Sequence, residues 1–219
     1  QVRNGFSSGV TEMSSGMVTF IFNQVILMYL TQDALVSYTI ISYVNNLVVL
    51  SATGIAQGAQ PLISYYYGQK RLDQCRSLFR YSLIAAGAMC TVSFTACFIL
   101  ARGIVNIYIG PELQALRDSS VTAFRIFTTS FLLVGFNIAV SGYFTSVERA
   151  AEALIISAGR GLILMAGCLI VMTRLFGGAG IWWSPLVSEA VSLAVTGLLL
   201  MRYCRKDAFW NQKVRFEVV

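Results

Sequence analysis

Residues 54–71 read Gly54-Ile-Ala-Gln-Gly-Ala-Gln-Pro-Leu-Ile-Ser-Tyr-Tyr-Tyr-Gly-Gln-Lys-Arg71. The segment starts inside a long apolar run and ends in a basic pair. Its first eight residues include two glycines, two glutamines and a proline, where a simple membrane anchor would carry leucine and valine. Helix breakers and amides are tolerated inside a bilayer only where other helices or a water-filled cavity satisfy their polar groups. The segment therefore predicts a helix that lines a path or bends.

The composition around this segment is that of a membrane protein. Apolar residues make up 56% of the 219 residues and charged residues only 12%, against about 25% charge in a typical soluble domain. Six apolar segments each approach the ~20 residues that a helix needs to cross a bilayer. We therefore predict an all-α membrane protein, a bundle of six transmembrane helices within residues 1–204, followed by a basic cytoplasmic tail at 205–219. The predicted spans are 10–30, 36–62, 78–101, 121–145, 152–173 and 181–202.

The distribution of basic residues predicts the orientation of these spans. Because positive charge is retained in the cytoplasm, the richer side is expected to be cytoplasmic and to hold both termini. A nucleic-acid partner is not expected, because the charge follows the membrane topology. One side collects Arg3, Lys70, Arg71, Arg76, Arg80, Arg149, Arg202, Arg205, Lys206, Lys213 and Arg215, and the other only Arg102, Arg117, Arg125 and Arg174.

The chemistry of the chain excludes several classes of site. It contains no histidine, so Ser/His nucleophile pairs, zinc–histidine sites and imidazole relays are absent. No enzyme activity and no cofactor are expected. The cysteines have no metal-ligand spacing and are interpreted as small buried apolar residues; they are Cys75, Cys90, Cys97, Cys168 and Cys204.

Four of the six predicted spans carry a polar stripe at helical spacing. In the sixth span hydroxyl residues recur every four positions, and we interpret that row as a packing face, since small polar residues hold membrane helices together. Gly54-x-x-x-Gly58 is likewise interpreted as a packing face. The stripes are Glu12, Gly16, Thr19 and Asn23; Ser42, Asn46, Val49, Thr53, Gln57 and Gln60; Ser130, Val134, Asn137 and Ser141; and Ser184, Ser188, Ser192 and Thr196.

Two carboxylates within the predicted spans are candidates for ion coupling. A charged side chain in the middle of a span costs about 2.5–3.5 kcal/mol on insertion scales, so it is normally paired, protonated or functional. Glu12 lies a turn into its span and could also be an interfacial helix-start residue. Glu189 lies deeper and could instead pair with Arg160. Arg160 falls in the fifth span, from which it could also extend to the cytoplasmic interface.

With these features, the sequence resembles the multidrug and toxic compound extrusion (MATE) family. The resemblance rests on three segments in the order and spacing of the family and covers essentially the whole chain. They are residues 54–71, the segment Thr11-Glu-Met-Ser-Ser-Gly-Met-Val-Thr-Phe-Ile-Phe-Asn23, and the segment Gly178-Ala-Gly-Ile-Trp-Trp-Ser-Pro-Leu-Val-Ser-Glu189.

The resemblance implies one lobe of a twelve-helix, pseudo-symmetric transporter that exports organic cations and other amphipathic compounds in exchange for H⁺ or Na⁺. The glutamate of the first span and the basic tail favour the C-terminal lobe, in a bacterial inner membrane. Glu12 then takes the acidic position of the first helix, with any Na⁺ site beside it and no other metal site. The fourth span departs from some members of the family, because it contains Arg125 and no carboxylate. We expect the chain to be part of a longer protein, whose N-terminal lobe, or a second copy, completes the cavity.

The expected mechanism is an antiporter whose two lobes rock around a central cavity. The residues expected to line the path in this lobe are Asn23, Asn46, Gln57, Asn137, Met17, Phe20 and Tyr43, the last three by adaptable apolar and cation–π contact. A flippase for lipid-linked precursors from the same superfamily is an alternative, although it tends to need more cations in the cavity. A non-transporting membrane subunit that binds partners through small-residue faces is another.

Overall fold

The computed structural model describes the fold of residues 2–206, and the side chains of residues 16–149 and 151–203. In that part of the chain all regular structure is helical. The helices are α1 (Val2–Tyr29), α2 (Asp33–Gly68), α3 (Leu72–Tyr108), α4 (Gln114–Thr128), α5 (Phe131–Ser146), α6 (Ala150–Ala158), the π-helix η1 (Gly159–Leu164), α7 (Met165–Phe176) and α8 (Gly178–Lys206).

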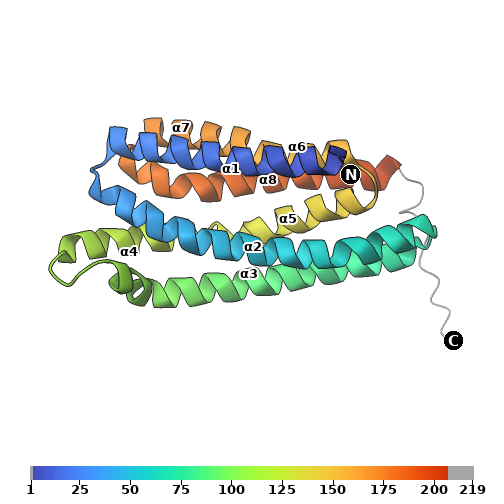
Figure 1. Cartoon of the computed structure of the whole chain (residues 1–219), viewed down its shortest axis with the longest axis horizontal. Helices are drawn as coiled ribbons and strands as arrows, with labels where there is room; N and C mark the ends of the chain where they lie inside the picture. Colours follow the sequence, from blue (N-terminus) through green and yellow to red (C-terminus); the bar gives the residue numbers. More distant parts are fainter. Residues whose placement is uncertain (1, 207–219) are drawn as a thin grey trace.

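These helices run up and down as six spans, since α4–α5 and α6–η1–α7 each form one continuous span (Figure 1). Five of the predicted spans fall inside one of the six, and the span predicted at 10–30 runs one residue beyond the end of α1. Five stretches are long and apolar enough to cross a membrane, and α1 contributes a shorter apolar stretch, Gly16–Tyr29. The start of α1 and the end of α8 lie at the same end of the bundle, together with the α2–α3 and α5–α6 turns (Figure 1). The first and last described helices therefore begin and end on the same side of the bundle.

The fourth and fifth spans contain irregular backbone. Between α4 and α5, Thr128, Thr129 and Ser130 each donate a hydroxyl hydrogen bond to the carbonyl three residues earlier, at 2.6–2.9 Å. Such bonds compete with the backbone ladder and interrupt a helix. In the fifth span the interruption is η1, a six-residue π-helix.

The two prolines inside helices, Pro61 and Pro185, do not break them. A proline lacks the N–H that would bond the carbonyl four residues earlier. For Pro185 that carbonyl belongs to Ile181, and the Ser184 hydroxyl donates to it at 2.7 Å. The neighbouring serine therefore satisfies the group that Pro185 leaves free, and α8 continues to the end of the bundle.

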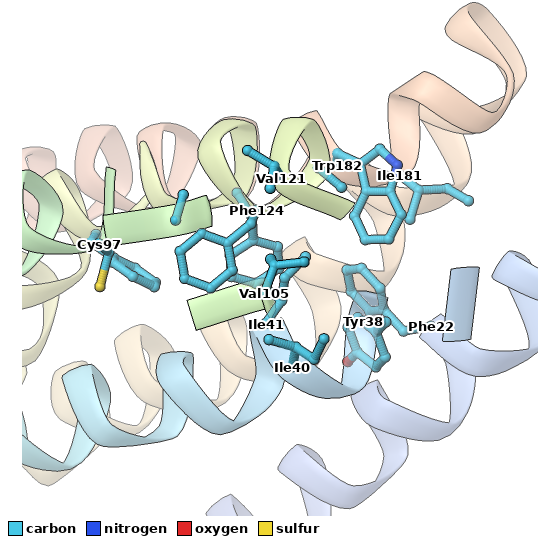
Figure 2. Close-up of a cluster of buried hydrophobic side chains, with 14 of the residues drawn as sticks. Phe22, Tyr38, Ile40, Ile41, Cys97, Val105, Val121, Phe124, Ile181 and Trp182 are labelled. Carbon is cyan, nitrogen blue, oxygen red and sulfur yellow. The ribbon is translucent and has the colours of Figure 1, made fainter. Parts of the chain in front are cut away.

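Two apolar clusters hold the spans together, one toward each end of the bundle. Figure 2 shows the cluster far from the termini, where side chains from α1, α2, α3, α4 and α8 meet. Phe22 of α1 stacks on Tyr38 of α2 with ring centroids 4.9 Å apart, and Trp182 of α8 lies beside them (Figure 2). The cluster near the termini is built by Ile63, Cys75, Phe79, Val140, Tyr143, Phe144, Val147, Ala153 and Ile156.

Helix α5 packs between its neighbours through two glycines. A Cβ at Gly135 would lie 2.5 Å from the Sγ of Cys90 and 3.2 Å from the carbonyl oxygen of Ala86, and one at Gly142 would lie 3.1 Å from the Cβ of Ala56. A Cβ at Gly54 or at Gly58 would have no described atom within 4 Å, and both glycines are exposed. The predicted packing face at Gly54-x-x-x-Gly58 is therefore wrong for contacts within this chain, and the close approaches lie on α5.

The cysteine interpretation is confirmed where side chains are described. Cys75, Cys90 and Cys97 are buried, Cys168 is half-buried, and all four are free thiols. The side chain of Cys204 lies outside the described residues.

The glycine contacts give a first prediction. Gly135→Ala should lower the apparent Tm of the purified protein in detergent, because overpacking costs typically about 1–3 kcal/mol. Gly58→Ala, the matched control, should leave the Tm unchanged or slightly raised, because alanine has the higher helix propensity. Equal effects of the two substitutions would contradict the assigned packing.

A charged cluster at the centre of the bundle

Three side chains from three spans meet midway along the bundle: Asn137 of α5, Arg160 of η1 and Glu189 of α8. Glu189 lies about 16 Å along α8 from Gly178, and Arg160 about 15 Å along the fifth span from Ala150, at 1.5 Å per residue. These two starting points are at opposite ends of the bundle (Figure 1). The three residues therefore lie near the middle of a membrane about 30 Å thick.

Both carboxylate oxygens of Glu189 have a donor. The Nδ2 of Asn137 donates to Oε2 at 2.7 Å and also lies 3.2 Å from the backbone carbonyl of Glu189. The Nη1 of Arg160 donates to Oε1 at 3.1 Å and forms the ion pair. The side chains of Arg160 and Glu189 are 19% and 15% exposed, and Asn137 is fully buried. The cluster is thus a partly buried ion pair completed by a buried amide.

The alternative that Glu189 pairs with Arg160 is confirmed by this geometry. The alternative that Arg160 extends to the cytoplasmic interface is wrong, because its guanidinium bonds to Glu189 inside the bundle. Asn137 was expected on the wall of a path, but it is fully buried and bonds to Glu189. It is therefore placed in the charged cluster.

One polar atom of the cluster has no partner. The Oδ1 of Asn137 is buried and accepts no hydrogen bond from the described residues. An amide oxygen left unpaired in a low-dielectric interior costs about 1–3 kcal/mol. An unpaired oxygen next to a carboxylate is consistent with a site that exchanges partners.

The other path residues lie on the outer faces of α1 and α2. Met17, Phe20 and Tyr43 are 52%, 63% and 58% exposed. Asn46 and Gln57 are exposed as well, and Asn23 is half-buried. None of these six side chains takes part in the hydrogen bonds or the ion pair of the charged cluster. The backbone of Glu12 lies in α1, but its side chain is outside the described residues.

The hydroxyl row of α8 is a packing face, as predicted, because all four residues are buried. Ser184, Ser188, Ser192 and Thr196 are 0%, 1%, 2% and 1% exposed. Helix α8 packs against α4, α5 and α7. The row holds α8 close to its neighbours on either side of Glu189.

A separate cavity of about 680 Å³ lies at the end of the bundle opposite the termini. It is bordered by the α1–α2 turn, α4 and Trp182 of α8, and Asp33 contributes a carboxylate. None of the residues expected to line a path borders it. Among the described side chains no group of three or more His, Cys, Asp or Glu residues could hold a metal ion.

Sequence reasoning missed the link between Asn137 and Glu189. Each residue was noted on its own helix, but the register that brings α5 and α8 together is set by packing. The π-helix was missed too, although the sequence Ser157-Ala-Gly-Arg-Gly161 offered a signal, since two glycines weaken the α-helix there.

The chain is similar to known membrane transporters in sequence and in fold. The sequence model of the MatE family matches residues 8–170. The multidrug export protein MepA of Staphylococcus aureus strain bovine RF122 / ET3-1 is 24% identical over 174 residues, which cover 80% of this chain and 37% of that protein. MepA of Staphylococcus haemolyticus is 23% identical over 159 residues, covering 72% of this chain and 34% of that protein.

Solved structures show the same fold. A multidrug resistance MATE family transporter in its inward-facing conformation matches 94% of this chain with a TM-score of 0.85 and 16% identity. An outward-facing structure with the same description matches 94% with a TM-score of 0.83 and 18% identity. The matched regions are 48% and 46% of those chains. The chain spans about half the length of these structures and just over a third of the curated relatives.

The ion pair gives a second prediction, tested by a double-mutant cycle on apparent Tm. Arg160→Met and Glu189→Met should each destabilise strongly, because each leaves an unpaired charge inside the bundle. The double substitution should cost less than the sum, with a coupling of about 1–3 kcal/mol.

The matched control is the pair Arg102–Asp118, which is 2.9 Å apart but 71% and 56% exposed. Its cycle should give a coupling of about 0.2–1 kcal/mol, as for other exposed pairs. If the coupling energy of Arg160 and Glu189 is no larger than that of Arg102 and Asp118, burial does not strengthen the ion pair and the prediction is wrong.

Proposed function

The chain belongs to the MatE family, and from that premise we propose that it is the C-terminal lobe of a secondary active multidrug efflux antiporter. In this proposal the transporter exports cationic or amphipathic compounds in exchange for H⁺ or Na⁺. The observation that carries the ion-coupling part is the carboxylate of Glu189, held midway through the bundle by Asn137 and Arg160. The transport part is supported by relatives that are named multidrug export proteins.

The outer face of α2 supports the presence of a second lobe. Asn46 and Gln57 are exposed on a helix that is long and apolar enough to cross the membrane. Amide side chains at that depth are costly to place against lipid. We therefore propose that this face meets a water-filled cavity completed by a second lobe, either an N-terminal lobe of the same protein or a second copy of this one.

The proposed transport cycle moves each lobe as a unit. The chain matches an inward-facing and an outward-facing structure with TM-scores of 0.85 and 0.83. Such similar values support a lobe whose internal fold changes little while its orientation changes, as in rocking transporters. Cation binding at Glu189, or at Glu12, then biases which side the cavity opens to.

We propose that the end with both termini is cytoplasmic and that the protein resides in a bacterial inner membrane. The α2–α3 turn at that end carries Lys70 and Arg71, and the α5–α6 turn carries Arg149. This agrees with the retention of positive charge in the cytoplasm. The curated relatives described above are bacterial.

The flippase alternative is less well supported. A lipid-linked precursor carries phosphates, so its transporter needs cations facing the cavity. Arg160 is the candidate in this chain, and its guanidinium is bonded to Glu189.

A third prediction tests the ion coupling in membrane vesicles that contain the protein as its gene encodes it. Glu189→Gln and Glu12→Gln should each reduce Na⁺- or H⁺-driven efflux of a fluorescent organic cation, because an amide cannot exchange a charge. The matched control is Glu148→Gln, an exposed residue in the α5–α6 turn, which should transport normally. Full ion-driven efflux in the two variants would remove these carboxylates from the mechanism, and no such efflux by the unmodified protein would favour a non-transporting subunit.

A fourth prediction concerns recognition of the exported compound. Tyr43→Ala should raise the KM for an aromatic organic cation about fivefold, since a cation–π contact is worth about 1 kcal/mol. Tyr81→Ala is the matched control, because Tyr81 is similarly exposed but lies on α3. Equal KM values for the two variants would argue against α2 as part of the path.

A further inference from the structure

Asn137 and Arg160 both donate a hydrogen bond to the carboxylate of Glu189, but they hold it with different numbers of contacts. Asn137 lies within hydrogen-bonding distance of both the carboxylate and the backbone carbonyl of Glu189. It projects from α5, which packs closely against α2 and α3 through Gly142 and Gly135. Asn137 and Glu189 therefore form the fixed half of the cluster.

Arg160 holds the carboxylate through a single nitrogen. A guanidinium has five N–H donors, and strong arginine–carboxylate pairs use two of them in parallel. Here only Nη1 bonds to Oε1, at 3.1 Å, and no other hydrogen bond from Arg160 to a described residue is seen. Among the described residues the guanidinium thus has a single hydrogen-bond partner, the carboxylate of Glu189.

The backbone at Arg160 also departs from the regular α-helix of the fifth span. Arg160 lies in η1, and π-helical turns occur frequently at functional sites. None of the residues of η1 is buried. Among the described residues, nothing lies within 4 Å of where a Cβ would be at the flanking Gly159 and Gly161. No described side chain therefore presses on the backbone at these two glycines.

If the guanidinium moves away, oxygen ligands are left behind. Oε1 of Glu189 becomes free, and Oδ1 of the buried Asn137 already lacks a partner. A carboxylate oxygen and an amide oxygen in a partly buried site suit a hard cation. A cation with one positive charge would neutralise Glu189 as Arg160 does.

We propose that Arg160 is a tethered cation that occupies a monovalent-cation site formed by Glu189 and Asn137. When the guanidinium withdraws, a mobile cation binds Oε1 of Glu189, which Arg160 has released, together with Oδ1 of Asn137, so Arg160 and the mobile ion compete for Oε1. The role of this exchange in transport rests on the proposed function, whereas the site itself can be tested by binding alone.

The test uses the purified protein, as its gene encodes it, and the apparent Tm in detergent. In Arg160→Ala the vacated site should accept small cations, so millimolar guanidinium chloride or NaCl should raise the Tm by several degrees relative to tetramethylammonium chloride at equal ionic strength. The unmodified protein and Arg160→Lys should show no such rise, because their own side chain fills the site. The rise should disappear in Arg160→Ala/Glu189→Gln.

Two results would overturn the proposal: no cation-dependent rise in Arg160→Ala, or a rise that persists when Glu189 is also replaced. If Arg160→Ala is not recovered as a monodisperse protein, Arg160→Gln keeps most of the side-chain volume and is subject to the same criteria. The proposed function fails separately, if vesicles with the unmodified protein show no ion-driven efflux.

Discussion

A carboxylate placed midway through a membrane-spanning bundle must find its hydrogen-bond donors among the protein's own side chains. Glu189 meets this requirement by bonding to one residue of the fourth span and one of the fifth. The bond from Asn137 links the rotation of α5 to that of α8, because turning either helix by one residue would take this donor away from the carboxylate. The apolar clusters at the two ends of the bundle then pack around that arrangement.

Much of the fold could be predicted from the sequence because a bilayer restricts the choices so severely. The lengths of the apolar segments predicted the six spans. The uneven distribution of Lys and Arg between the two sides predicted that both termini lie at one end. The hydroxyl row of α8 was correctly interpreted, since small residues at four-residue spacing have few uses other than close packing. The interruption at Thr128–Ser130 was missed because the length of an apolar segment does not indicate where its helix is interrupted. The three consecutive hydroxyl residues could have indicated it.

The charged cluster could be predicted only in part, since it depends on contacts between helices. Pairing of Arg160 with Glu189 was foreseen from the need of each charge for a partner. The amide of Asn137 was not placed with them, because helical periodicity defines a face of one helix and not the helix that it meets. The glycines were assigned wrongly for the same reason: Gly54 and Gly58 have the familiar spacing, but the tight contacts belong to Gly135 and Gly142.

The short connection between α7 and α8 has a consequence for how the protein is made. Gly177, with φ at 60°, is the single residue between the two helices, so the fifth and sixth spans form a hairpin with almost no connecting loop. The fifth span emerges first, with Arg160 exposed to an insertion cost of about 2.5–3.5 kcal/mol. Its counter-charge follows on the other arm of the same hairpin.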